Sequence, residues 1–252
     1  HVHWKQEANG SRTLAGPGLM HALEFLRPAA RMAIRPVYAV VGDDAYLRRE
    51  VGSALVQLAL GAGADDLAVA RFAGDHATLA DVLDELRTLP FLAPRRVVVV
   101  ENADPFVTAH RKELEVYAEN PTETGTLVLM VKTWPANTRL AKLVGQVGQA
   151  IDCKTTKQAE LPDWLVRRAS EVEGVKLDPD AARLLVELVG PEIGLLASEL
   201  EKLVTYVGDR RAIGRDDVAR MVGAGRVETI WRVLEAATTG RAAEALDLLD
   251  RL

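Results

Sequence analysis

Between residues 36 and 153, short apolar runs alternate with segments whose apolar residues recur at helical spacing. The runs are continuously apolar, which is typical of strands that are buried on both faces. Such strands, separated by helices, predict a parallel sheet covered by helices on both sides, the α/β class of fold. We predict strands at 37–41, 67–72, 97–100, 127–131 and 150–153, and helices at 79–89, 109–118 and 140–147.

The segment after the first strand shows the helical spacing most clearly in this part of the chain. Its apolar residues follow at steps of four, four and three: Leu47, Val51, Leu55 and Leu58. Either Asp43 or Asp44 is suited to be the N-cap of this helix, because a short carboxylate accepts hydrogen bonds from the first free amides. Gly61 and Gly63 are expected to end it.

The alternation stops near Lys154, and a polar stretch at 154–160 predicts a linker. Every later pattern is helical. The run Asp178-Pro179-Asp180 predicts a helix start, and another helix is expected to be capped around Asp216. The residues expected on the buried faces are Leu165, Ala169 and Val172 in one helix and Leu196, Leu200, Leu203 and Val207 in another.

These patterns divide the chain into four segments. Residues 1–19 have no apolar periodicity and are expected to form a disordered leader. Residues 20–154 predict the α/β domain, and 155–224 predict a small helical domain. Residues 225–252 are expected to begin a third helical domain, because the sequence ends on a helix-competent stretch without a C-cap signal.

Composition excludes several classes of protein. The 31 Lys and Arg residues are outnumbered by 36 Asp and Glu residues, for a net charge of −5, whereas a chain that binds nucleic acid over its whole surface would be basic. The single cysteine, Cys153, makes an internal disulfide or a thiolate metal cluster impossible. No apolar run reaches the ~18 residues of a membrane span. We expect a cytoplasmic protein without a metal site.

An α/β sheet followed by a small helical unit is the general plan of AAA+ nucleotide-binding modules. Their first strand leads into a glycine-rich loop that ends in Lys and Ser/Thr at a helix N-terminus and cradles phosphate. Here the loop is Gly42-Asp43-Asp44, which places two carboxylates where phosphates would lie and lacks the Lys-Ser/Thr pair. The third strand is followed by Glu101, one carboxylate where Mg²⁺ sites usually use two. We expect no ATP binding and no cofactor.

No other catalytic constellation is evident. His21, His76 and His110 are scattered, without a Ser or Cys partner in a recognisable nucleophile motif. Cys153 ends a predicted buried strand, which favours an inert core thiol. Whether the chain belongs to an enzyme stays open on this basis. Two alternatives remain: an active P-loop-type ATPase with an atypical loop, and a helical scaffold for which the α/β part is a platform.

Three stretches, taken in order, resemble one family, the delta subunit of the bacterial DNA polymerase III clamp loader. They are 37–47, 89–100, and 196–203 with Tyr206 and Gly208. The resemblance covers the chain from about Met20 onward. It implies a non-hydrolysing AAA+-like subunit of a DNA-directed DNA polymerase holoenzyme, a nucleotidyltransferase complex. It also places Gly194 near the position where AAA+ relatives use an arginine to sense ATP.

The resemblance further implies the partners. They are the sliding clamp (the beta subunit), the gamma/tau and delta prime subunits of the loader, and primed DNA reached through the assembled loader. The family's clamp-opening element is a pair of adjacent large apolar residues before the third strand. The matching segment here is Leu89, Pro90, Phe91 and Leu92.

The composition of this segment independently favours apolar side chains that are available to a partner. Pro90 and Pro94 bracket Phe91 and Leu92 and stiffen the backbone, so neither the helix before nor the strand after can absorb them. Burying each side chain is worth ~1.5–3 kcal/mol, which makes exposure costly unless a partner covers them. The alternative is that Phe91 packs beneath the sheet as ordinary core.

Basic residues gather between 132 and 168, where seven of them against three acids give a local charge of +4. The candidates for contact with DNA phosphates are Lys132, Arg139, Lys142, Lys154 and Lys157. The alternative is a solvated face between domains.

Overall fold

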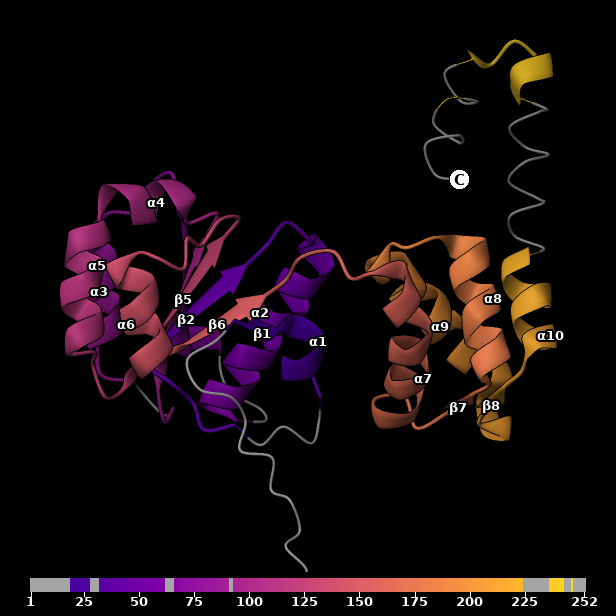
Figure 1. Ribbon diagram of the computed structural model, residues 1–252, viewed down its shortest axis with the longest axis horizontal. Coiled ribbons are helices and arrows are strands. Elements are labelled where there is room, and N and C mark those ends of the chain that lie inside the picture. The colour runs from indigo at the N-terminus through magenta and orange to yellow at the C-terminus, as the bar shows by residue number, and fades with distance from the viewer. Residues whose placement is uncertain are drawn as a thin grey trace, which may run out of the picture. The chain divides into compact units, whose positions relative to one another are not determined.

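The computed structural model describes residues 19–27, 32–61, 66–90, 93–223, 236–242 and 246 (Figure 1). The chain divides into two compact units, and we call them the sheet unit and the helical unit. The sheet unit comprises the described residues of 1–20, 34–41 and 56–152, and the helical unit comprises those of 21–33, 42–55 and 153–252. Helix α2 (Ala45–Leu60) belongs to both units: its residues up to Leu55 are part of the helical unit, and those from Val56 onward are part of the sheet unit.

A six-stranded sheet runs in the order β1-β6-β2-β5-β4-β3. Each pair from β6 to β3 is parallel, as the continuously apolar runs predict. In the pair at one end, Val69 of β3 lies opposite Val97 of β4. The strands are β1 (Met20–His21), β2 (Val37–Val41), β3 (Val69–Ala73), β4 (Arg96–Glu101), β5 (Gly125–Val131) and β6 (Gln149–Asp152).

Both faces of the central strands are buried. On one face, alternate residues of β2, β4 and β5 pack with residues of four helices, and Figure 1 shows α3, α5 and α6 along that face. The residues between them, such as Tyr38, Val40 and Val99, are buried as well. The α/β class is therefore confirmed. The four helices are α3 (Leu79–Arg87), α4 (Asp104–Ala109), α5 (Arg111–Glu119) and α6 (Arg139–Val147).

The helix predicted at 109–118 is present as α5, but the prediction missed that two helices meet at His110 (φ −118°, ψ 27°). The first begins five residues earlier, with Pro105 in its first turn. The carboxylate of Asp104 accepts hydrogen bonds from the amides of Lys132 (2.9 Å) and Thr133 (3.1 Å), which ties this helix start to the end of β5. Such long-range bonds have no signature in local periodicity.

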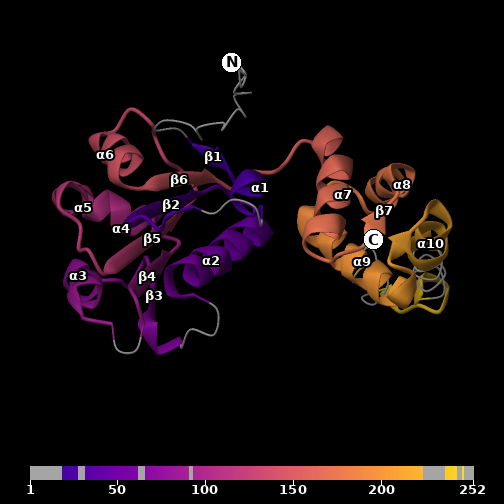
Figure 2. The ribbon, with the colours of Figure 1, turned by 90° about the horizontal axis from the view of Figure 1, so that it is seen from below.

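The helical unit contains α1 (Ala22–Phe25), the first part of α2, and a group of later helices seen in Figure 2. Two short strands accompany these helices (Figure 1). As predicted, Asp178 caps a helix, its carboxylate accepting from the amide of Asp180 at 2.7 Å. The later elements are η2 (Gln158–Glu160), α7 (Leu161–Glu171), β7 (Lys176–Leu177), α8 (Pro179–Val189), α9 (Ile193–Val207), η3 (Gly208–Arg210), β8 (Ala212–Ile213), α10 (Arg215–Val218) and the π-helical turn η4 (Ala219–Gly223).

Two details of the helical predictions are wrong. Val172 is 52% exposed rather than buried, because α7 ends at Glu171 and the chain turns away there. The helix expected to be capped around Asp216 has its N-cap two residues earlier, at Gly214. Its cap comes from Asp217, whose carboxylate accepts from the Gly214 amide at 2.9 Å and from Arg210 at 2.9 Å. The stripe on α9 is buried as predicted.

The predicted leader and the predicted third domain lie almost entirely outside the described residues, as do Phe91 and Leu92. Within the described ranges, none of the helices combines the length and the apolar character that crossing a membrane requires.

Candidate functional site

The loop after β2, where a nucleotide-binding module would hold phosphate, is packed directly against another backbone. Gly42 adopts φ +137°, and a Cβ placed on it would lie 2.4 Å from both the carbonyl carbon and the oxygen of Cys153. The amide of Asp44 donates to that same carbonyl oxygen at 3.2 Å. Glycine is therefore required at 42 for this close approach, and not for cradling a ligand.

The first turn of α2 is capped by the chain itself. The Asp44 carboxylate accepts a hydrogen bond from the amide of Leu47 at 2.9 Å, so of the two candidate N-caps the structure selects Asp44. Asp43 is exposed beside it. The Asp44 carboxylate already accepts the hydrogen bond of an amide that a phosphate would use, and its negative charge would repel a phosphate. These residues do not fit a nucleotide phosphate.

Gly194, near the position of the AAA+ sensing arginine, lies against the ring of Tyr46. A Cβ on Gly194 would meet the Tyr46 Cβ at 3.2 Å and ring carbons at 3.4 Å. The Arg49 guanidinium lies 5.4 Å from the centre of the same ring. Burial raises the pKa of Tyr46 to about 12. An aromatic side chain thus occupies space that an arginine at 194 would have to cross.

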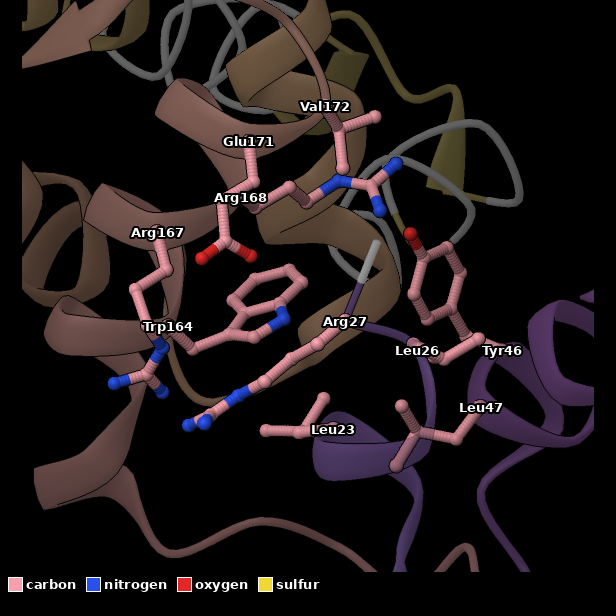
Figure 3. Close-up of a pocket in the computed structure, with 10 residues that line it drawn as sticks. All are labelled: Leu23, Leu26, Arg27, Tyr46, Leu47, Trp164, Arg167, Arg168, Glu171 and Val172. Carbon is pink, nitrogen blue, oxygen red and sulfur yellow. The ribbon is translucent and has the colours of Figure 1, made fainter. Parts of the chain in front are cut away.

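A small cavity of about 40 Å³ adjoins Tyr46 within the helical unit (Figure 3). Trp164 and Arg168 of α7 line it together with residues of α1 and α2. The Arg168 guanidinium lies 3.5 Å from Glu201, 4.0 Å from Glu50 and 5.9 Å from the centre of the Trp164 ring. Ligand pockets for drug-sized molecules measure ~300–1,000 Å³. A cavity of this size holds a few waters and no nucleotide.

The carboxylate at the end of β4 also has a local partner. Glu101 lies 3.6 Å from Arg71 on the neighbouring strand β3, and both side chains are about half exposed. Asn102 follows in a left-handed conformation (φ 48°). An arginine therefore balances the charge that would hold Mg²⁺ in an ATPase. Among the residues that the structure describes, His, Cys, Asp and Glu side chains form no group of three suited to a metal ion.

The predicted clamp-binding segment starts on a strongly exposed residue. Helix α3 ends at Arg87, and the Thr88 hydroxyl donates to the Asp84 carbonyl at 2.8 Å. Leu89 follows with 79% of its surface exposed, and Pro90 is partly exposed. Phe91 and Leu92, predicted to be interface anchors with core packing as the alternative, lie outside the described ranges.

The predicted DNA-contacting residues are divided between the two units. All five are exposed: Lys132, Arg139, Lys142, Lys154 and Lys157. The first three belong to the sheet unit and the last two to the helical unit. Arg139 forms an ion pair with Glu119 and lies 3.9 Å from Glu115, so carboxylates already balance its charge.

Sequence reasoning overlooked Tyr46, Trp164 and Arg168, and it assigned Leu67 to a strand. Leu67 instead lies in the turn η1 (Asp66–Ala68) and is 73% exposed. No sequence motif marks the first three residues. Tyr46 simply follows the N-cap of a helix, and its contacts with a distant helix cannot be read from the local pattern. For Leu67 the adjacent Asp65-Asp66 pair could have indicated that the strand begins later.

Residues 38–154 match the sequence model of the family described as DNA polymerase III, delta subunit. The chain is 26% identical over 226 residues to DNA polymerase III subunit delta of Bacillus subtilis, an alignment that covers 85% of this chain and 65% of that protein. The chain therefore spans about two thirds of the length of this relative.

Among solved structures, the Bacillus subtilis DNA clamp loader delta protein superposes with a TM-score of 0.67 at 25% identity, over 87% of this chain and 67% of that one. The RuvB Holliday junction branch migration motor of Thermotoga maritima aligns over 79% of this chain and 65% of its own, with a TM-score of 0.41 and 15% identity. The predicted resemblance to the delta subunit is confirmed, and the likeness to its solved structure agrees with the α/β class of the fold.

Proposed function

We propose that this chain acts as a clamp-loader delta subunit, which binds the sliding clamp of a bacterial replicase and opens it for loading onto primed DNA. In this role it hydrolyses no ATP itself. The observation that carries the proposal is the exposure of Leu89 at the start of the segment that resembles the family's clamp-opening element. The match of residues 38–154 to the delta-subunit family supports it.

A segment that begins on an exposed leucine is suited to enter a pocket on a partner. It begins directly after a helix whose last turn is closed by Thr88, and prolines at 90 and 94 limit its backbone freedom. Little conformational entropy is then lost on binding, and large apolar side chains that fill a pocket dominate interface energetics. Leu89, Pro90, Phe91 and Leu92 would supply the anchors.

The capped loop after β2 supports the second part of the proposal. Asp44 on the first turn of α2 and Tyr46 against Gly194 leave an arrangement that favours packing within the chain over nucleotide binding. An active ATPase with an atypical loop is correspondingly disfavoured. The gamma/tau and delta prime subunits would be its partners in the assembled loader, and the complex would act in the bacterial cytoplasm.

Of the basic residues, Lys132, Lys142, Lys154 and Lys157 remain candidates for contact with DNA phosphates in that assembly. Arg139 is less suited, because its charge is balanced by Glu119. Removing a phosphate contact lowers the salt dependence of binding by about one counterion, which is how such contacts are recognised.

The main experiment measures affinity for the purified sliding clamp by surface plasmon resonance. The double variant Phe91→Ala, Leu92→Ala is expected to lose at least about 100-fold in affinity, which corresponds to ~2.7 kcal/mol. The control is Val116→Ala, which removes another exposed apolar side chain, on α5, and is expected to leave affinity unchanged. Equal clamp affinity in the double variant and the wild type would refute the assignment.

A second experiment titrates ATP with Mg²⁺ into the chain by calorimetry. No binding heat is expected up to millimolar nucleotide. Micromolar affinity would contradict the non-hydrolysing role and would revive the ATPase alternative.

A further inference from the structure

Leu67 is exposed on 73% of its surface, at the same end of the sheet as the segment that begins at Leu89. It lies in η1, directly before β3, and the residues from 93 onward lead into β4. Strands β3 and β4 are parallel neighbours with Val69 opposite Val97. Carried two residues back, that register brings Leu67 level with Arg95, so both segments approach the amino-terminal edge of the sheet.

Arg96 links these segments through a single side chain. Its Nε donates to the Glu85 carboxylate at 2.8 Å, a second guanidinium nitrogen donates to the same carboxylate, and a third donates to the carbonyl oxygen of Leu67. Glu85 belongs to the last turns of α3, four residues before Leu89. The Arg96 side chain is only 17% exposed, and a planar guanidinium with bonds on both sides holds a fixed geometry.

The size of a stable interface calls for more than one short segment. A specific protein–protein interface covers about 800 Å² on each partner, and four side chains bury well under that. In the described part of the sheet unit, the large apolar side chains that stand exposed are Leu19, Leu67, Leu89 and Val116. Leu67 is the one that Arg96 ties to α3. A neighbouring ion pair, Asp84–Arg87 at 3.8 Å, gives the apolar surface a charged border, as interfaces commonly have.

We propose that Leu67 is a second apolar anchor for the sliding clamp, and that Arg96 is a positioning residue which sets its placement relative to Leu89. The inference rests on the proposed function and extends its contact surface from 89–92 to η1. The clamp then contacts two segments at one sheet edge, and a rigid guanidinium bridge keeps their spacing constant.

The experiment measures clamp affinity for Leu67→Ala in the full chain, with Val116→Ala as the control for loss of an exposed apolar side chain on α5. Leu67→Ala is expected to weaken clamp binding about five- to twentyfold, and Val116→Ala by less than twofold. A loss below twofold in Leu67→Ala, while the Phe91→Ala, Leu92→Ala variant loses binding, overturns the inference and leaves the proposed function standing. Absence of clamp binding by the wild-type chain overturns the proposed function itself.

Arg96→Lys tests the positioning role, because lysine keeps the charge opposite Glu85 and loses the second arm that reaches the Leu67 carbonyl. It is expected to weaken binding three- to tenfold in the wild-type background and by less than twofold when Leu67 is already alanine. An equal loss in both backgrounds overturns the positioning role. Thermal unfolding of each variant, expected within a few degrees of wild type, separates this coupling from a general loss of stability.

Discussion

The loop after β2 and the segment before β4 both connect a helix with a strand. The first is packed against the rest of the chain, whereas the second begins with an exposed leucine. At the first, Gly42 abuts the backbone of Cys153 and Asp44 caps α2, so the groups that could hold a ligand bind parts of the same chain. At the second, Leu89 is left almost fully exposed. The loop after β2 is therefore filled by packing within the chain, whereas Leu89 leaves apolar surface exposed.

Mutations at these two places are therefore expected to change different quantities, the stability of the fold and the affinity for a partner. A change at the filled loop removes contacts within the chain, and it should lower the free energy of unfolding. Leu89 is largely exposed, so a change there removes few contacts within the folded chain and should appear mainly in the affinity for a partner. Substitutions in and around the loop after β2 test the expected loss of stability, and the clamp-binding variants test the expected loss of affinity.

The largest loss of stability is expected for Gly42→Ala. The new Cβ would lie 2.4 Å from backbone atoms of Cys153, which cannot move aside as a flexible side chain can, and φ +137° is unfavourable for any L-residue. We expect the free energy of unfolding to fall by more than ~3 kcal/mol, or the chain to fail to fold. Chemical denaturation measures it.

Gly61→Ala is the matched control for this variant. Gly61 also has a positive φ, +83°, but a Cβ there would meet no atom within 4 Å. Its cost is expected to be the backbone strain alone, about 1 kcal/mol. If the two variants were equally destabilised, the close packing of the loop against Cys153 would contribute nothing.

A smaller effect is expected for Asp44→Ala. Loss of the carboxylate leaves the Leu47 amide without its hydrogen bond and removes a negative charge from the helix N-terminus, which together cost ~1 kcal/mol of stability. Asp43→Ala, one residue earlier and exposed, should change the unfolding free energy by less than ~0.5 kcal/mol. The reverse ranking would show that Asp43 is the functional cap.

The sequence predicted the architecture more fully than the sites. The strand at 37–41 was located to the residue because its continuous apolar run has few other structures open to it, and the stripe on α9 followed from helical spacing. The sequence could not decide whether Asp43 or Asp44 is the N-cap, because the two carboxylates are adjacent and only the backbone geometry distinguishes them. The contact of Gly194 with Tyr46 and the link from Arg96 to Leu67 join residues far apart in the chain. Local patterns carry no information on such pairs.

The smallest effect, and the one that most directly probes how the filled site is packed, is expected for Tyr46→Phe. Within the described part of the chain the Tyr46 hydroxyl is buried without a hydrogen-bond partner. Leaving a buried hydroxyl unsatisfied is unfavourable, so its removal should cost nothing at pH 8 and could add up to ~1 kcal/mol of stability.

The pH dependence of the same variant supplies an independent measurement. Burial raises the pKa of Tyr46 from 10.0 to about 12, so between these values the unfolded chain loses the proton while the folded chain keeps it. The stability that wild type has below pH 10 therefore falls as the pH rises toward 12, by at most about 1.4 kcal/mol per pH unit from this group. Tyr38 and Tyr117, whose pKa values burial also raises, titrate equally in both proteins. The difference in unfolding free energy between Tyr46→Phe and wild type should then grow in favour of the variant from pH 10 upward. A constant difference across that range would mean that the Tyr46 ring is solvated, and that the loop after β2 is not closed by packing within the chain.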